Sequence, residues 1–547
     1  MGHRSETSLW WQTGVIYQIY PRSFQDSNGD GTGDLNGITQ RLDYLAETLG
    51  VDAIWLSPFY PSPMKDFGYD ITNYLDVDPI FGTLEDFDRL VAEAHARDLQ
   101  IIVDFVPNHT SEEHPWFQES RSSRGNQRRE WYVWRDPSPD GGPPNNWLAV
   151  PGGSAWELDE HTGQYYLHSF LKEQPDLNWR NPLVEDAMFD VLRFWLERGV
   201  DGFRIDMAQR ILKDPDFRDN PPDTSSDRPY KSLGRYDSQL HVYDQGHPDI
   251  HAVYRRVRHL LDSYSSSRPR MAGGEIHIFD YSQWASYYGI ELDELHLPFN
   301  FGLIGVPWEA AAVRRVVDSI EGVMRPGSWP NYVLGNHDEH RIATRAGEAQ
   351  ARVAMMLLLT LRGTPTVYYG DELGMTDVPI PAERIQDPWE RTEPGLGLGR
   401  DPERTPMQWD ASPNSGFCPP EARPWLPISE NCGRVNVQQE YDDAGSMLSL
   451  ARTLLTLRRQ HPSLHLGSYH PVELGESPCF AYWREEGDER HLVALNFTGE
   501  SQNLHIPNGG GGRLRLSTTN PDSDLVVDLA RLTLSPNEGC IVDLRGR

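Results

Sequence analysis

Short apolar runs alternate with helical patterns through most of the first 460 residues of the chain. Apolar residues recur at helical spacing over 84–97 and 185–198, between segments that are typical of buried strands. Alternation of strands and helices indicates βα units around a parallel sheet. We therefore predict an α/β fold, a (β/α)8 TIM barrel, with strands at 15–20, 53–57, 100–104, 202–206, 271–275, 295–299, 332–335 and 365–369.

Two segments are too long to be simple connections between a strand and a helix. Residues 105–175 are rich in Trp, Pro and Gly, which indicates a small domain inserted after the third strand, and 376–440 form a Pro-rich insertion after the eighth. Towards the end of the chain the pattern changes to short alternating strands with turn signals. We predict a barrel, an inserted domain and a C-terminal antiparallel β domain, formed respectively by 1–104 with 176–465, by 105–175 and by 466–547.

The net charge and the cysteines indicate what kind of partner the protein binds and in which cellular compartment it lies. The formal net charge is −31, which would repel nucleic acid and anionic membranes but imposes no penalty on a neutral ligand such as a sugar. The sequence shows no apolar stretch of a secretory signal or a membrane span. Its four cysteines are widely spaced, unlike a disulfide framework or a metal site. We expect a cytoplasmic protein with a small-molecule partner.

Three apolar runs end in a carboxylate, namely Asp206, Glu275 and Asp338. One acid at the end of a strand is usually a turn former or a helix cap. Three of them at the carboxyl ends of barrel strands, where TIM-barrel catalytic groups lie, favour chemistry instead. A glycosidase needs one carboxylate as nucleophile and one carboxylic acid as proton donor, without a catalytic cofactor. The pattern therefore predicts a glycosidase.

Four strings resemble, in order, the signature regions of glycoside hydrolase family 13, the α-amylase family. They are DFVPNH (104–109), GFRID (202–206), GGEI (273–276) and NHD (336–338), and the resemblance covers nearly the whole chain. The motifs DSNGDGTGD, DFGYDI, YYLHSFL, QPDLNW and RTPMQW are similar to those of the α-glucosidase and oligo-1,6-glucosidase branch, in particular of Thermus-type bacteria. The resemblance implies a retaining exo-α-glucosidase that removes terminal glucose from short α-glucosides through a covalent intermediate.

The resemblance also implies separate roles for the three acids. Asp206 would be the nucleophile, Glu275 the general acid and base, and Asp338 the carboxylate that stabilises the transition state. Arg204 lies two residues before Asp206, so it faces the same side of the strand and can hold that carboxylate in its charged form.

The same resemblance implies a pocket for one glucose unit. Asp66 would bind a terminal hydroxyl, and Tyr69 would support the sugar ring with its π face. His109 and His337 would form hydrogen bonds with the hydroxyls of that sugar. Arg404 would close the pocket, and we keep Arg400 as a second candidate.

Three further positions concern the shape of the pocket, and two of them, Met207 and Pro151, bear on specificity. Phe170 matches an aromatic wall of the pocket, with an ordinary core position as the alternative. Met207 follows the nucleophile where relatives carry a small or β-branched residue that helps to separate α-1,4 from α-1,6 linkages. Pro151 stands where an aromatic residue is expected on the acceptor side. Linkage preference and the balance between water and sugar acceptors stay open.

The segment DSNGDGTGD predicts a structural Ca²⁺ site, with Mg²⁺ or a plain polar turn as alternatives. Oxygen ligands at alternate positions of a loop suit a hard cation. A complete EF-hand is excluded, because Gly37 stands at position twelve instead of a glutamate. Relatives in this branch carry such an isolated loop, and its ligands here would be Asp26, Asn28, Asp30, the carbonyl of Thr32 and Asp34.

Two other functions remain open at this point. A transglucosidase or a trehalose or sucrose isomerase would use the same covalent intermediate. A non-catalytic sugar-binding or transporter-accessory protein would share the fold without the chemistry. Oligomeric state and activation by cations or salt stay undetermined.

Overall fold

The computed structural model describes residues 9–225, 231–266, 268–392, 394–507, 509–520 and 525–544. Eight parallel strands form a closed barrel in the order β1-β11-β10-β9-β8-β7-β3-β2, which confirms the predicted fold. The predicted strands differ from the observed ones by at most two residues at either end. The observed bounds are β1 Ile16–Ile19, β2 Ala53–Leu56, β3 Gln100–Phe105, β7 Gly202–Ile205, β8 Met271–Glu275, β9 Leu297–Asn300, β10 Asn331–Val333 and β11 Thr364–Tyr368.

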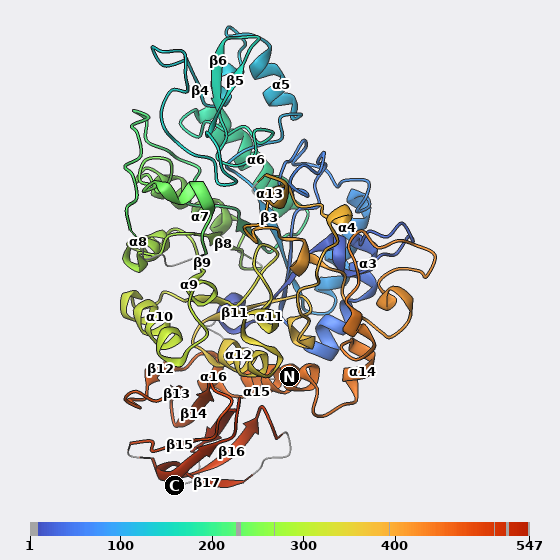
Figure 1. The fold of residues 1–547 in the computed structure, drawn as a ribbon, viewed down its shortest axis with the longest axis vertical. Coiled ribbons are helices and arrows are strands. Elements are labelled where there is room, and N and C mark those ends of the chain that lie inside the picture. The colour runs from blue at the N-terminus through green and yellow to red at the C-terminus, as the bar shows by residue number, and fades with distance from the viewer. Residues whose placement is uncertain are drawn as a thin grey trace.

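Helices surround the barrel and leave its strands buried on both faces (Figure 1). Local signals set their ends: Thr83 caps the helix that follows it, and Asn181 with Pro182 begins the next one. The longer helices are α3 Leu35–Gln40, α4 Leu84–His95, α5 Pro115–Ser122, α6 Pro182–Glu197, α7 Ile250–Ser263, α10 Ala310–Val323, α12 Glu348–Thr360 and α15 Met447–Gln460. Short helices are α1 Trp10–Thr13, α2 Pro21–Phe24, α8 Tyr281–Ala285, α9 Gly302–Gly305, α11 Ile342–Ala346, α13 Pro388–Thr392, α14 Val437–Tyr441 and α16 Pro462–His465.

The segment between β3 and α6 carries a small antiparallel sheet of its own. Its strands are β4 Trp134–Arg135, β5 Trp156–Asp159 and β6 Gln164–Leu167, in the order β4-β6-β5. This sheet lies at one end of the molecule, and the C-terminal strands lie at the opposite end (Figure 1). The inserted segment therefore projects beyond the barrel.

The C-terminal part of the chain is an antiparallel β domain, as predicted. Its main sheet has the order β12-β13-β14-β19-β16-β17, and β15 pairs with β18 in a separate two-stranded sheet. All four cysteines are free thiols. Within the described ranges, the helices are too short or too polar for a membrane crossing. The strands are β12 Ser468–Pro471, β13 Cys479–Glu486, β14 Glu489–Asn496, β15 Gln502–Leu504, β16 Gly511–Ser517, β17 Val526–Asp528, β18 Leu532–Leu534 and β19 Gly539–Asp543.

Candidate active site

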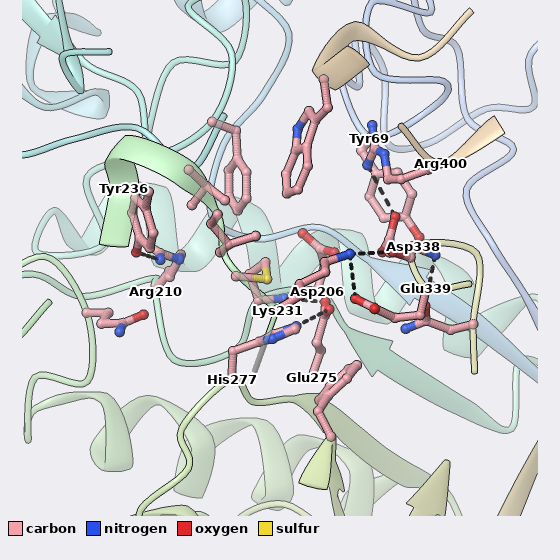
Figure 2. Close-up of a pocket in the computed structure, with 18 of the residues that line it drawn as sticks. Tyr69, Asp206, Arg210, Lys231, Tyr236, Glu275, His277, Asp338, Glu339 and Arg400 are labelled. Atoms are coloured by element: carbon pink, nitrogen blue, oxygen red, sulfur yellow. Dashed lines mark hydrogen bonds and ion pairs between the residues drawn. The ribbon is translucent and has the colours of Figure 1, made fainter. Parts of the chain in front are cut away.

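The three predicted catalytic carboxylates converge on one cavity at the carboxyl ends of the barrel strands (Figure 2). Asp206 directly follows β7, Glu275 is the last residue of β8, and Asp338 lies in the loop after β10. The cavity has a volume of about 250 Å³, near the lower end of the range for small-molecule sites. The parallel barrel thus brings together acids that are widely separated in the sequence.

The guanidinium of Arg204 contacts the carboxyl groups of both Asp206 and Glu275. Its Nη1 lies 2.9 Å from Asp206 Oδ1 and 3.0 Å from Asp104 Oδ1, and its Nη2 lies 2.6 Å from Glu275 Oε2. The guanidinium is almost fully buried, so these contacts are little screened by water. One planar group therefore fixes Asp206 and Glu275 as neighbours.

The pKa values of the two carboxyls are shifted in opposite directions, upward for Asp206 and downward for Glu275. Burial raises the pKa of Asp206 more than Arg204 lowers it, and the charge of Glu275 raises it further. Burial also acts to raise the pKa of Glu275, but Arg204 and His277 outweigh it and lower that pKa to about 2. His277 Nε2 lies 2.9 Å from Glu275 Oε1. These directions are opposite to the ionised Asp206 and protonated Glu275 that the assigned roles require.

Asp338 is held as an anion by three cationic or polar neighbours. Arg404 Nη2 lies 2.7 Å and Arg400 Nη1 3.2 Å from Asp338 Oδ1, and His337 Nε2 lies 3.3 Å from Oδ2. Although burial acts to raise it, these neighbours hold the pKa of Asp338 well below its usual range. A fixed negative charge beside the cavity is what a cation-like transition state requires.

Asp66 and Arg400 form one wall of the cavity. Arg400 Nη2 donates to Asp66 Oδ1 at 2.7 Å, and Gln174 Nε2 donates to Asp66 Oδ2 at 3.0 Å. Gln174 Nε2 also lies 3.1 Å from His109 Nε2, which is 3.1 Å from the carbonyl of Tyr69. Asp66, Tyr69, His109 and Arg400 all line the cavity, so this polar wall can form hydrogen bonds with sugar hydroxyls.

His337 and Arg404 lie behind the wall and are absent from the residues that line the cavity, although the sequence predicted direct roles for both. The ring of His337 stacks on Tyr69 with centroids 5.3 Å apart, and its Nε2 lies 2.6 Å from Tyr69 Oη. Gln18 Nε2 lies 2.8 Å from its Nδ1, and burial lowers the pKa of His337 to about 3. In this structure His337 positions Tyr69, and Arg404 positions Asp338.

Met207 and Phe170 line the cavity, and Pro151 does not. Met207 lines the cavity with its backbone in the left-handed region at φ 40°, and its N–H donates to Glu275 Oε2 at 3.1 Å. Phe170 also lines the cavity and packs against His109, with ring centroids 5.2 Å apart. Pro151 lies outside that cavity, in an adjoining groove of about 820 Å³ that Phe170 shares. Phe170 is therefore the boundary between the two spaces.

The sequence predicted no role for three residues that contact the site, namely Asp104, Gln174 and His277. Asp104 accepts from Arg204 and from Tyr69 Oη, at 3.0 and 2.9 Å. Asp104 and Gln174 are the first residues of two quoted motifs, DFVPNH and QPDLNW. His277 lies two residues after Glu275, the same offset that identified Arg204. The two-residue spacing in the sequence would therefore have indicated a role for His277 beside Glu275.

The predicted metal ligands lie in the loop between α2 and α3, and none of them lines the cavity. Both carboxylate oxygens of Asp26 accept backbone N–H groups of the loop, and so do the side-chain oxygens of Asn28 and Asp30. Asp34 instead caps α3 and also accepts from Ser27. Both Asp26 and Asp34 accept hydrogen bonds on their two carboxylate oxygens, and all five predicted ligands keep the oxygen chemistry that suits Ca²⁺.

Comparisons with known proteins agree with this geometry. The family model described as "Alpha amylase, catalytic domain" matches residues 18–467. A "Probable alpha-glucosidase" of Rhizobium meliloti is 43% identical, in an alignment that covers 91% of this chain and 91% of its own. An "Oligo-1,6-glucosidase" of Parageobacillus thermoglucosidasius is 37% identical and covers 98% of this chain and 99% of its own.

A solved structure of a glucosyl transfer enzyme is also similar to this chain in its three-dimensional fold. The crystal structure of XgtA, described as an alpha-glucosyl transfer enzyme, superimposes with a TM-score of 0.92 at 41% identity, and the match covers 99% of this chain and 100% of the other. The family match spans the barrel with its inserted segment, and three of the four signature strings supply the three catalytic carboxylates of the cavity. The chain is a member of glycoside hydrolase family 13, the α-amylase family.

Proposed function

We propose that the protein is a retaining exo-α-glucosidase that releases terminal glucose from short α-glucosides. The observation that carries this proposal is the bridge of Arg204 between Asp206 and Glu275. Retaining glycosidases need two carboxyls about 5–5.5 Å apart, whereas inverting enzymes leave about 6.5–9.5 Å for a water molecule. Two carboxyls bound to one guanidinium fit the closer spacing.

The reaction follows from the positions of the three acids. Asp206 attacks the anomeric carbon as its bond to the leaving oxygen breaks, and Glu275 gives that oxygen a proton. Asp338 stabilises the positive charge that develops on the sugar. Glu275 then removes a proton from water, which attacks the same carbon and releases Asp206. Two inversions leave the α configuration of the glucose unchanged.

The exo mode is supported by the wall that Asp66 and Arg400 build. Arg400 bonds Asp66, Asp338 and Asp387, at 2.7, 3.2 and 2.6 Å. This charged wall would contact the hydroxyls of a terminal glucose and would block a chain from continuing past it. The relatives named as α-glucosidase and oligo-1,6-glucosidase support the same substrate class.

A transfer reaction is the second candidate. The groove beyond Phe170 has room for an acceptor in place of water, and XgtA, named for glucosyl transfer, supports this alternative. Time courses with maltose, sucrose and trehalose separate the two functions. Glucose as the main product throughout supports the hydrolase, whereas isomers or longer sugars at early times would support transfer and contradict simple hydrolysis.

Replacing Arg400 with methionine is expected to lower kcat/KM for an aryl α-glucoside by the order of 10²-fold. Loss of one partner of a buried ion pair costs about 3–5 kcal/mol, and here it would leave Asp66 and Asp338 without a shared cation. Initial rates over a range of substrate concentrations test this. The matched control is Arg434→Met, because Arg434 is an exposed arginine paired with Glu348. Equal kcat/KM values in the two variants would contradict the role of Arg400.

We also propose that the 26–34 loop binds a structural Ca²⁺ ion. Its oxygen donors support a hard cation. Removal of calcium with a chelator is expected to lower the Tm while leaving the substrate pocket intact, and Asp30→Asn should weaken the response. Melting curves with and without Ca²⁺ measure this effect. A Tm that Ca²⁺ leaves unchanged in the wild type would favour the plain polar turn.

We place the protein in the cytoplasm. The four free thiols suit a reducing compartment, and a small α-glucoside is the only partner that the proposed reaction requires. Fractionation of the source cells, followed by the activity assay on each fraction, tests this placement. Activity found mainly outside the cytoplasmic fraction would contradict it.

A further inference from the structure

We propose that His340, Asp377 and Glu403 form a binding site for a divalent transition-metal ion. Each side chain offers one ligand atom, and the three atoms lie within 4.8 Å of one another. His340 Nδ1 lies 2.8 Å from Asp377 Oδ2 and 3.7 Å from Glu403 Oε2. The site belongs neither to the catalytic cavity nor to the 26–34 loop.

Glu403 supplies an independent observation that points to a ligand. Its side chain is only 2% exposed, and no hydrogen bond from a described residue reaches its Oε2. A buried carboxylate oxygen without a hydrogen-bond partner is costly and needs an explanation such as an ion or an ordered water. Since Oε2 is the Glu403 atom nearest to His340, the oxygen is aimed into the group.

The donor set selects the class of ion. One imidazole nitrogen with two carboxylates suits Zn²⁺ or a neighbouring divalent transition metal. Mg²⁺ and Ca²⁺ prefer all-oxygen ligands, so they should compete poorly. His340 is 41% exposed, which gives the ion a path from solvent, while Glu403 forms the buried end.

The site joins three segments around Asp338. His340 lies two residues after Asp338, and Asp377 Oδ1 accepts from the backbone N–H of Arg341 at 2.9 Å. Glu403 immediately precedes Arg404, which donates to Asp338 Oδ1. A metal ion would therefore tie together the loop that carries this carboxylate and the two segments that support it.

A protonated Glu403 is the competing explanation. Burial and the charge of Asp377 raise the pKa of Glu403 well above its usual range, against the opposing charges of Arg404 and Lys231, which favours a neutral carboxyl in the absence of metal. Metal binding would release that proton. The two explanations differ in whether zinc is retained, and the retention can be measured directly.

The test uses the full chain, stripped with a chelator and then equilibrated with buffered zinc in the micromolar range. Bound zinc is measured by mass spectrometry after gel filtration. We expect one zinc ion per chain, and at least about 10-fold weaker binding in Glu403→Gln and His340→Ala. His461→Ala is the matched control, because it removes a ligand from the other candidate group, His461, Glu489 and His491, and should keep this zinc ion.

Thermal unfolding provides the second readout. Zinc should raise the Tm of the wild type and of His461→Ala, but not that of Glu403→Gln. Without zinc, Glu403→Gln should melt no lower than the wild type, because it removes the buried charge. His340→Ala covers the case in which that variant misfolds, since His340 is partly exposed. Absence of zinc from the wild type, or equal zinc affinity in the wild type and His340→Ala, would overturn the site. Neither assay uses substrate, so failure here leaves the proposed function untouched.

Discussion

Asp206→Asn is expected to lower kcat for an aryl α-glucoside by at least about 10⁴-fold. Rate losses of this size are usual when an enzyme loses the nucleophile that forms its covalent intermediate. The amide has nearly the same size and can still lie beside Arg204, so binding of the sugar should change little. Without a carboxylate at this position, no glucosyl–enzyme bond forms. Steady-state rates and an independent measurement of ligand affinity separate the two effects.

The matched control for this variant is Asp190→Asn, which removes an exposed carboxylate from α6 and should leave kcat unchanged. Circular dichroism verifies that both proteins are folded. If a folded Asp206→Asn protein kept more than a few per cent of the wild-type kcat, Asp206 would not be the nucleophile. That result would also contradict the proposed covalent mechanism.

Glu275→Gln is expected to lower kcat/KM for maltose by about 10²–10⁴-fold, the usual contribution of a general acid. When the phenol of an aryl α-glucoside is acidic, it leaves without full protonation. The value of kcat/KM for such a substrate should therefore fall much less. The second half of the reaction still needs Glu275 as a base. Glucosyl-enzyme should therefore accumulate with the aryl substrate, and a burst of phenol should precede a slow steady state.

His277→Gln is the control that separates a positioning residue from the acid itself. His277 Nε2 contacts Oε1 of Glu275, whereas Arg204 and the Met207 N–H donate to Oε2. We expect a smaller loss that is similar for both substrates. Equal losses on maltose and on the aryl substrate in Glu275→Gln would contradict the assignment of Glu275 as proton donor.

The barrel was accessible from the sequence because its strands are short, continuous apolar runs. Both faces of a parallel barrel strand are buried, so the runs stand out against their flanks, and the predicted ends differ from the observed ones by at most two residues. The positions of Asp206 and Glu275 follow directly, because a strand end fixes where the next side chain points. This part of the site required only local information.

The walls of the pocket depend on contacts between distant segments, which local patterns do not reveal. Arg400 reaches Asp66 across 334 positions of the chain, and nothing near either residue indicates the pair. For the same reason, the sequence placed His337 and Arg404 against the sugar, whereas the structure places them behind Tyr69 and Asp338. Asp34 shows the opposite case, because its place directly before α3 is a capping signal that the sequence itself displays.

The configuration of the first sugar released tests the central claim most directly. An aryl α-glucoside yields one glucose molecule per turnover, so proton NMR within the first minutes reports which anomer leaves the enzyme before mutarotation mixes them. Two displacements at one carbon, the first by Asp206, predict α-glucose as the initial product. β-Glucose as the initial product would show a single displacement by water and would contradict the account of the Asp206–Glu275 pair.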